Sequence, residues 1–291
     1  MARMSVIERA RRWWRGHVTV ETVPAAARRG AVDHVVILDG TLSTLTPGQE
    51  GNAALLFYLL TKNTRSLSRN VYYEPGQQWE GWRHGINIIE GRGVNPQIRR
   101  AYGWLASHYM PGDRIYLFGY SRGAFAVRSI AGVIDRVGLL RREHATERGV
   151  RAAFRHYRRS PNSTSAQDFA RHFCYPETAI QMIGVWDTVK ALGLKFPWFL
   201  TPPVATTIFR DHILGDTTLR GFHALAKDET RAIFAPILWD TTHGDPLRVE
   251  QVWFTGAHGD IGGNIGKWVQ CRPLANIPLV WMLEKAETMG L

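Results

Sequence analysis

One pentapeptide, Gly119-Tyr120-Ser121-Arg122-Gly123, constrains the fold of this chain more than any other feature. An apolar run, Ile115-Tyr116-Leu117-Phe118, precedes it, and a stretch typical of a helix, residues 124–131, follows it. This order predicts a strand, a sharp turn and a helix, with the serine hydroxyl exposed on the turn. The glycines fit such a turn because a Cβ at either place would clash where strand and helix pack closely. Ser121 is therefore a candidate nucleophile.

The Gly-x-Ser-x-Gly pattern alone does not identify Ser121 as a nucleophile, so the residues on either side of it must be considered. Glycine and serine are common residues, so a Gly-x-Ser-x-Gly pattern also arises by chance. An ordinary turn serine is the alternative interpretation of Ser121. The apolar strand before the pattern and the helix after it favour the nucleophile.

Composition allows one large hydrophobic core, because the chain has 291 residues of which 45% are hydrophobic. The net charge is +11, from 36 Lys and Arg against 25 Asp and Glu. Such a balance either favours anionic partners, such as phospholipid headgroups, or describes a solvated, arginine-rich surface. The two cysteines, Cys174 and Cys271, lack metal-ligand spacing and are expected to be buried thiols.

Residues 1–30 are expected to form a basic, amphipathic N-terminal extension. Ile7, Trp13 and Trp14 fall near helical spacing, with arginines between them. Such a helix either lies at the surface of an anionic membrane or docks on the body of the protein. No apolar run has the length of a membrane span, and Glu21 interrupts the one candidate for a signal peptide. We therefore expect a protein that is cytoplasmic where it is made.

Residues 31–291 are predicted to form one α/β domain, because short apolar runs alternate with helical stretches along them. The expected strands cover 35–38, 70–73, 115–118 and 179–186, and the expected helices cover 52–60, 98–108 and 141–159. This alternation predicts a mostly parallel, doubly wound sheet with helices on both faces. Ligands of such sheets bind beyond the carboxyl ends of the strands, where Asp39 and Ser121 both lie.

A serine nucleophile requires a base, and the base must be held by a third group. In the α/β-hydrolase fold the chain order is serine, then an acid, then histidine. Asp187 follows an apolar strand, so its carboxylate is expected in the same crevice as Ser121. His258 follows another strand and opens a glycine-rich loop. The sequence therefore predicts Ser121, Asp187 and His258 as the catalytic residues.

Other residues compete for these roles. His212, His223 and His243 also follow Asp187, but none of them combines a strand end with flanking glycines. Asp260 lies close to His258 in the chain, and its position is more typical of a residue that braces the loop. We therefore prefer Asp187 as the acid.

An oxyanion hole requires two backbone N–H donors. We expect one from Arg122, directly after the nucleophile, and one from Gly40 or Thr41, after an early strand. The alternative for this early turn is that it only ends a strand. Supporting roles are expected for Asp39, Gly119, Gly123 and Asp260. The chain has neither a Walker motif nor a metal-spaced His/Cys cluster, so we expect no metal and no other cofactor.

With these residues identified, the chain resembles the catalytic domain of bacterial type VI secretion phospholipase effectors of the first lipase class. The matching stretches follow one another from about residue 32 to the C-terminus, and they are Leu38–Thr41, Pro111–Ala124, Gly184–Val189, Ala224–Glu229 and Trp253–Gly263. The resemblance implies an α/β-hydrolase fold and the same three catalytic residues. Two departures flank the histidine: Thr255 replaces a usual proline, and Asn264 replaces a common third glycine.

The resemblance implies a serine hydrolase of carboxylic esters, with phospholipid acyl esters as the expected substrate and delivery to target cells if the chain is an effector. Two alternatives remain open. The first is an esterase for small soluble esters, and the second is a non-catalytic binding module on a hydrolase fold. The intact order of the candidate residues argues against the second, so we expect no nucleic acid partner. The sequence does not define the oligomeric state.

Overall fold

The computed structural model describes residues 19–22, 30–41, 43, 45–62, 68–76, 94–189, 212–242 and 245–291. The amphipathic helix expected around Trp13 and Trp14 lies outside these residues, as does His243. Both stay predictions.

Seven strands form one sheet in the order β1-β3-β2-β4-β5-β6-β7. Their bounds are β1 Thr19–Thr22, β2 Asp33–Leu38, β3 Arg69–Glu74, β4 Arg114–Tyr120, β5 Ile180–Trp186, β6 Thr218–Ala226 and β7 Val249–Phe254. The pairings of β2 to β7 are parallel, and among the described strands β1 alone runs antiparallel to its neighbour, β3. The predicted mostly parallel sheet is confirmed.

Strand β1 lies within the segment that the sequence assigns to the N-terminal extension. Its four residues pair with β3, with Thr19 opposite Tyr73 and Thr22 opposite Asn70. Part of this segment is therefore an edge strand of the sheet rather than an appendage to it.

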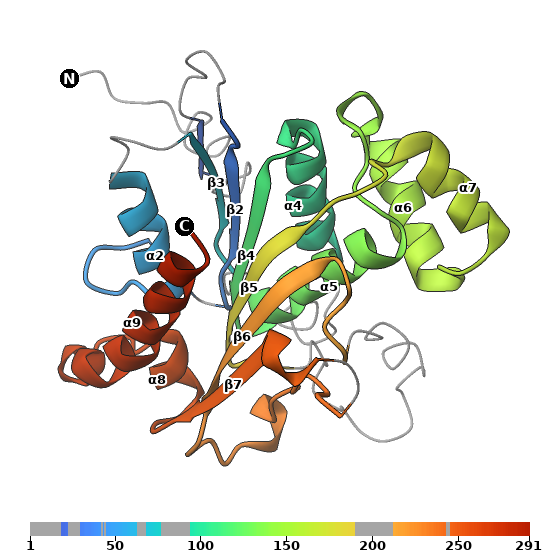
Figure 1. The fold of residues 1–291 in the computed structure, drawn as a ribbon. Coiled ribbons are helices and arrows are strands. Elements are labelled where there is room, and N and C mark those ends of the chain that lie inside the picture. Colours follow the sequence, from blue (N-terminus) through green and yellow to red (C-terminus); the bar gives the residue numbers. More distant parts are fainter. Residues whose placement is uncertain are drawn as a thin grey trace, which may run out of the picture.

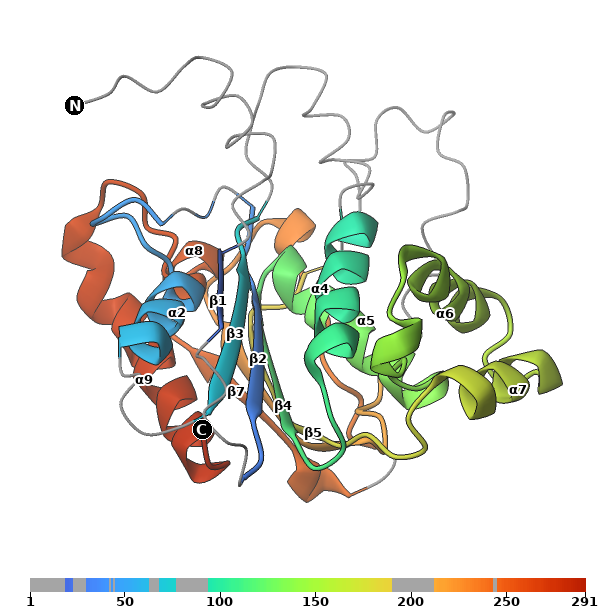
Figure 2. The same ribbon diagram turned by 90° about the horizontal axis from the view of Figure 1, so that it is seen from above.

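Helices cover both faces of the sheet (Figure 1). The helices are α2 Asn52–Lys62, α4 Val94–His108, α5 Arg122–Arg136, α6 Glu147–Arg159, α7 Thr164–Phe173, α8 His258–Gly262 and α9 Arg272–Thr288. Short 3₁₀ turns are η1 Arg142–His144, η3 Ala232–Phe234, η4 Pro246–Arg248 and η5 Val269–Cys271. Helices α2, α8 and α9 lie on one face, and α4 to α7 lie on the other, as the turned view also shows (Figure 2).

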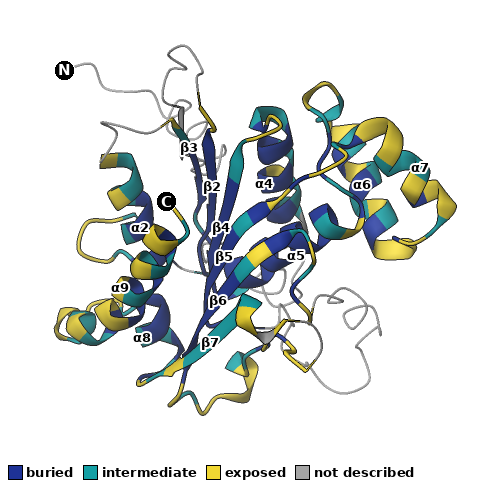
Figure 3. Ribbon diagram, in the orientation of Figure 1, coloured by how far each residue is buried: buried dark blue, intermediate teal, exposed yellow. Residues whose placement is uncertain are grey.

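The two faces of the sheet explain the apolar strands. Successive side chains of a strand point to opposite faces. Val35 and Ile37 accordingly join the core beneath α2 and α9, whereas Val36 and Leu38 join the core beneath α4 and α5. Every residue of β2 is buried, and this strand is dark blue in Figure 3. A strand covered on both sides reads as a continuous apolar run, which is why it could be found from sequence.

Some elements carry weaker signals. Strand β6 was not predicted, because Gly221 and His223 interrupt its apolar run. Helix α9 was not predicted either, and it contains Pro278 in its interior. Of the two free cysteines, Cys174 is buried as expected, but Cys271 is half-buried.

The parallel strands bring the ends of four segments to one edge of the sheet. Leu38 is opposite Gly119, and Tyr120 is opposite Trp186. Trp186 is in turn opposite Ala224, the third residue from the end of β6. The residues that follow β2, β4, β5 and β6 therefore lie along one line, which is where a ligand of such a sheet binds.

Candidate active site

Ser121 occupies a strained backbone conformation between β4 and α5. Its φ of 57° and ψ of −118° lie outside the regions that an L-residue ordinarily adopts. Backbone hydrogen bonds hold it there: its N–H donates to the Trp186 carbonyl at 3.0 Å, and its carbonyl accepts from the Phe125 N–H at 3.2 Å. The predicted sharp turn is present, and it presents a serine side chain at the carboxyl end of the sheet.

The two glycines of the pentapeptide are required by close packing. A Cβ on Gly119 would lie 2.5 Å from the Gly123 carbonyl oxygen, and one on Gly123 would lie 2.0 Å from the Leu38 carbonyl oxygen. Real Cβ atoms do not approach backbone so closely, so any side chain would force α5 away from β2 and β4. The turn therefore keeps its shape only with glycine at both places.

Asp187 is the first residue after β5, and it also has a positive φ, of 41°. Its N–H donates to the Ala224 carbonyl at 2.8 Å, and its Oδ1 accepts from the Ala226 N–H at 3.1 Å. The side chain is fully buried. These contacts with β6 leave the second carboxylate oxygen, Oδ2, facing His258.

His258 joins Ser121 and Asp187 in one line of contacts. Its Nδ1 lies 2.6 Å from Asp187 Oδ2, and its Nε2 lies 2.8 Å from Ser121 Oγ. A carboxylate only accepts hydrogen bonds, so Nδ1 carries the proton and Nε2 is left to accept from the serine hydroxyl. The three residues that the sequence predicted are thus brought together. An imidazole in this arrangement is able to take the hydroxyl proton of the serine.

Aromatic rings pack against the imidazole of His258. The Phe234 ring stacks on it with centroids 4.6 Å apart, and the Tyr120 ring lies 4.9 Å away. The Tyr120 hydroxyl also donates to the His258 carbonyl at 3.1 Å. Burial raises the pKa of Tyr120 well above its usual value, so this phenol remains a neutral donor. The imidazole of His258 is therefore positioned by ring packing against Phe234 and Tyr120 as well as by the contacts of its two nitrogens.

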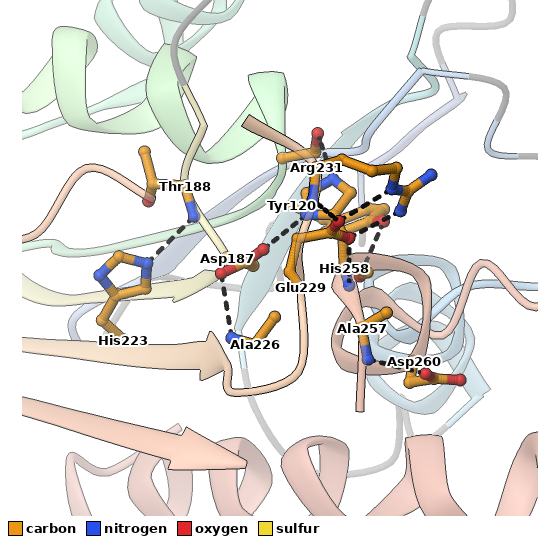
Figure 4. A network of polar contacts seen from close by, with 11 residues as sticks. Tyr120, Asp187, Thr188, His223, Ala226, Glu229, Arg231, Ala257, His258 and Asp260 are labelled. Atoms are coloured by element: carbon orange, nitrogen blue, oxygen red, sulfur yellow. Dashed lines mark hydrogen bonds and ion pairs between the residues drawn. The ribbon is translucent and has the colours of Figure 1, made fainter. Parts of the chain in front are cut away.

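His258 begins the short helix α8, whereas the sequence predicted only a glycine-rich loop at this place. Asp260 Oδ2 accepts from the Ala257 N–H at 2.9 Å, within the first turn of this helix. Asp260 thus contacts the backbone of the histidine turn, whereas Asp187 is the carboxylate that contacts the imidazole (Figure 4).

The early turn Asp39–Thr41 lies beside the elbow. The Gly40 N–H donates to Asp39 Oδ1 at 2.7 Å, so this N–H is already engaged. In the part of the chain that the structure describes, the Thr41 N–H has no acceptor, which leaves Thr41 as the better candidate donor of the two. Arg122 opens α5, where a helix leaves its first N–H groups to acceptors outside it. The oxyanion pair stays a prediction, with Arg122 as one donor and Thr41 as the candidate for the other.

The Asp39 side chain makes hydrogen bonds that hold this turn in place. Its Oδ2 accepts from the Tyr73 hydroxyl at 2.7 Å, and its side chain is buried. Burial raises the pKa of Asp39, although its hydrogen bonds with Tyr73, Ser43 and Gly40 act in the opposite direction. The supporting role of Asp39 stays a prediction, and these contacts are the interactions through which it would act.

His223 is a residue whose place the sequence did not reveal. It is fully buried in β6, and its Nε2 accepts from the Thr188 N–H at 3.0 Å. Burial lowers its pKa well below the usual value, so the ring is neutral and able to accept. His223 therefore steadies the residue next to Asp187 (Figure 4) and is not placed to act as a base. The other competitor, His212, is exposed.

Asn264 offers a reason for one departure from the family pattern. Its Nδ2 donates to the Thr41 carbonyl at 3.4 Å, so it links the histidine segment to the candidate oxyanion turn. A glycine at this position would have no side chain to make the link.

Taken together, these features define a class of protein. A serine on a strand–turn–helix elbow, followed in the chain by an acid and a histidine at the carboxyl ends of parallel strands, is the architecture of the α/β-hydrolases. A family model described as "T6SS, Phospholipase effector Tle1-like, catalytic domain" matches residues 33–285. The chain therefore belongs to this family, and the resemblance found in the sequence is confirmed.

Similar proteins include one from yeast and several solved structures. The uncharacterized protein YEL023C of Saccharomyces cerevisiae is 31% identical over 197 residues, which cover 59% of this chain and 28% of the yeast protein. An uncharacterized protein from Pseudomonas aeruginosa has a TM-score of 0.47 at 16% identity, over 90% of this chain and 46% of that one. The chain thus spans less than half of these two relatives.

Two further similar structures are those of an effector and an esterase. The Tle1 effector bound to the VgrG spike of the type 6 secretion system gives a TM-score of 0.40 at 16% identity, over 85% of this chain and 57% of that one. Esterase 2 of Thermogutta terrifontis has a TM-score of 0.46 at 13% identity, over 92% of this chain and 89% of the esterase.

Two further findings on the described residues concern membrane-spanning helices and clusters of metal ligands. No described helix has the length and apolar character needed to cross a membrane. Within the same residues, no three His, Cys, Asp or Glu side chains gather as ligands of a metal ion.

Proposed function

We propose that this domain hydrolyses carboxylic esters, most specifically the acyl esters of phospholipids, with Ser121 as nucleophile, His258 as base and Asp187 as the group that orients His258. The observation that carries the proposal is the continuous line of contacts, 2.8 Å from Ser121 Oγ to His258 Nε2 and 2.6 Å from His258 Nδ1 to Asp187 Oδ2. The substrate class comes from the family to which the chain belongs.

In the first half of the reaction, Ser121 Oγ bonds to the ester carbonyl carbon while His258 Nε2 takes the hydroxyl proton. The tetrahedral intermediate collapses as the bond to the alcohol oxygen breaks. That oxygen receives the proton from His258 Nε2, and the alcohol leaves as a lysophospholipid. The acyl group remains on Ser121.

In the second half, water takes the place of the alcohol. His258 Nε2 accepts a proton from the water as its oxygen bonds to the acyl carbon, and then returns that proton to Ser121 Oγ as the bond to the serine breaks. A fatty acid is released. Asp187 accepts from Nδ1 throughout and stabilises the imidazolium that forms in each half.

The negative oxygen of both intermediates requires donors that are already in place. The N–H groups of Arg122 and Thr41 are the proposed pair. One such donor is worth about 3–4 kcal/mol of transition-state stabilisation in enzymes of this type. The hydrogen bonds from Gly40 and Tyr73 to Asp39, both 2.7 Å, would keep the turn that carries Thr41 in position.

The proposed partners are lipid surfaces. A net charge of +11 favours contact with anionic headgroups, and a family of secreted effectors implies delivery to a target cell. Both remain proposals, as does the assignment of residues 31–291 to one catalytic domain.

Acyl release from anionic phospholipid vesicles tests the proposal, with Ser121→Ala as the matched control. We expect fatty acid from the wild type and none above background from the variant. Equal release by both would refute it. Hydrolysis of short soluble esters with no action on vesicles would favour the small-ester alternative. Failure of a fluorophosphonate to label Ser121 would favour a binding module.

A further inference from the structure

The segment that follows β6 contains charged residues for which the proposed reaction has no use. Strand β6 ends at Ala226, and after Lys227 the chain continues with Asp228 and Glu229. Arg231 follows two positions after Glu229. This segment lies against the turn that carries His258. It belongs to one of the stretches by which the sequence resembles its family, but nothing in the sequence assigns it a role.

Three consecutive backbone N–H groups before and at the start of α8 are each bound by a carboxylate. The Gly256 N–H donates to Asp228 Oδ2 at 2.7 Å, and the His258 N–H donates to Glu229 Oε2 at 3.2 Å. The Ala257 N–H between them donates to Asp260. The carboxylates of Asp228 and Glu229 thus fix the backbone of the histidine turn from a different strand.

Arg231 holds the Glu229 carboxylate in place. Its Nε and its backbone N–H both donate to Glu229 Oε1 at 2.8 Å, and its Nη2 donates to Oε2 at 2.6 Å. The side chain of Glu229 is only 4% exposed, whereas that of Arg231 is 57% exposed. The hydrogen bonds from Arg231 lower the pKa of Glu229 to about 2, so Glu229 is charged at any pH at which the domain would work.

Arg231 also reaches His258 by a second route. Its guanidinium lies 4.3 Å from the centre of the Phe234 ring, on which the His258 imidazole stacks at 4.6 Å with an angle of 21° between the planes. The pair Glu229–Arg231 therefore contacts His258 at its backbone directly and at its ring through Phe234.

We propose that Glu229 and Arg231 are positioning residues for His258: together they hold the histidine backbone and, through Phe234, the imidazole at the place where Nε2 meets the Ser121 hydroxyl. This inference rests on the proposed function of His258 as the base. Among the described residues, their contacts are with the His258 N–H and the Phe234 ring rather than with Ser121 Oγ or His258 Nε2, so both are inferred to act through the histidine. A displacement of about 1 Å in a catalytic group is enough to lower a rate about 100-fold.

The test measures p-nitrophenyl butyrate hydrolysis by Glu229→Ala, Glu229→Gln and Arg231→Ala, each made in the wild type and in a His258→Ala background. Asp168→Ala is the matched control, because it breaks an exposed ion pair with Arg171 on α7, outside the site. We expect Glu229→Ala and Arg231→Ala to lower kcat about 10- to 100-fold with KM changed less than about twofold. Glu229→Gln, which retains an acceptor for the His258 N–H, should recover part of the loss.

The His258→Ala background separates positioning from a merely structural role. If Glu229 acts only through the imidazole, Glu229→Ala should leave the residual rate of His258→Ala unchanged within about twofold. An equal loss in both backgrounds would overturn the inference, as would an effect on KM alone or a loss matched by the Asp168→Ala control.

A second readout does not depend on hydrolysis. The Nδ1 proton of His258, hydrogen-bonded to Asp187, should give a downfield proton NMR signal that His258→Ala lacks. Glu229→Ala should broaden or remove this signal by faster exchange with water, whereas Asp168→Ala should leave it intact. An undisturbed signal in Glu229→Ala would refute positioning, whatever the outcome for ester hydrolysis. Activity that survives Ser121→Ala would instead count against the proposed function alone.

Discussion

The strained backbone conformation of Ser121 predicts that the stability of the fold depends on whether residue 121 has a Cβ. Replacing the serine with glycine removes both the hydroxyl and the Cβ, whereas replacing it with alanine removes the hydroxyl and retains the Cβ. At a φ of 57° and a ψ of −118°, only glycine is free of steric strain. Both variants should be inactive, but we expect Ser121→Gly to be the more stable of the two.

The magnitude follows from three opposing effects. A non-glycine residue in such a region costs about 1–3 kcal/mol, and the distance of this one from the left-handed helical region places it in the upper half of that range. Glycine loses about 0.5–1 kcal/mol more conformational entropy on folding. The methyl group of alanine contributes up to about 0.8 kcal/mol when buried. The net expectation is that glycine stabilises the fold by about 1 kcal/mol relative to alanine, which is about 2 °C in Tm at this chain length.

Thermal and urea unfolding of the two variants, measured side by side, provide the assay. Ester hydrolysis confirms that both lack activity, so no catalytic difference enters the comparison. The reasoning is refuted if Ser121→Gly melts at or below the temperature of Ser121→Ala, because the elbow would then carry no strain for glycine to relieve.

Three further outcomes can be checked. Asp187→Asn should lower kcat for ester hydrolysis by about 10³–10⁴-fold, since an amide favours the wrong imidazole tautomer, and a loss below tenfold would contradict the assigned role. The pKa of Glu229 falls from 4.5 to about 2 on folding, so its charge stabilises the fold above pH 4.5 and ceases to do so as the pH falls to 2. Solvent screening at its exposed arginine partner reduces this contribution to about 1 kcal/mol, so the urea stability gap between wild type and Glu229→Gln should narrow from pH 7 to pH 3, and a constant gap would count against it. Gly123→Ala should destabilise by about 3 kcal/mol or more because its Cβ would meet backbone at 2.0 Å, whereas Gly103→Ala, inside α4 with its nearest neighbour at 3.4 Å, should stabilise slightly in the same unfolding assay.

The parts of the fold that could be located from the sequence are marked by local patterns. The elbow is marked by a strand, two glycines and a helix within a few residues, and buried parallel strands such as β2 read as unbroken apolar runs. Chain order then selected Asp187 and His258, because parallel strands place their carboxyl ends at one edge. The contact of both residues in the structure follows from that topology.

What the sequence did not reveal depends on contacts between distant segments. Strand β6 is hidden because His223, an ionisable residue, is buried there as a neutral acceptor for the Thr188 N–H. The role of Glu229 depends on its place 29 residues before His258 and on the pairing of β6 with β7 that brings them together. No local pattern reports such a contact. The engagement of the Gly40 N–H by Asp39 is local, but it depends on a side-chain rotamer that the sequence does not specify.

The order of the strands has a consequence for how the protein folds. Ser121 and His258 are 137 residues apart in the chain, and Asp187 and His258 are 71 apart, yet their side chains touch. Contacts of such long range form slowly, since the entropy of closing large loops is lost before any of these contacts stabilises the chain. Helices α4 to α6 need only local hydrogen bonds, so helical structure should return early during refolding. The contacts of His258 with Ser121 and Asp187 are complete only after β7 has paired with β6, so recovery of the proposed hydrolysis would mark the end of folding rather than its beginning.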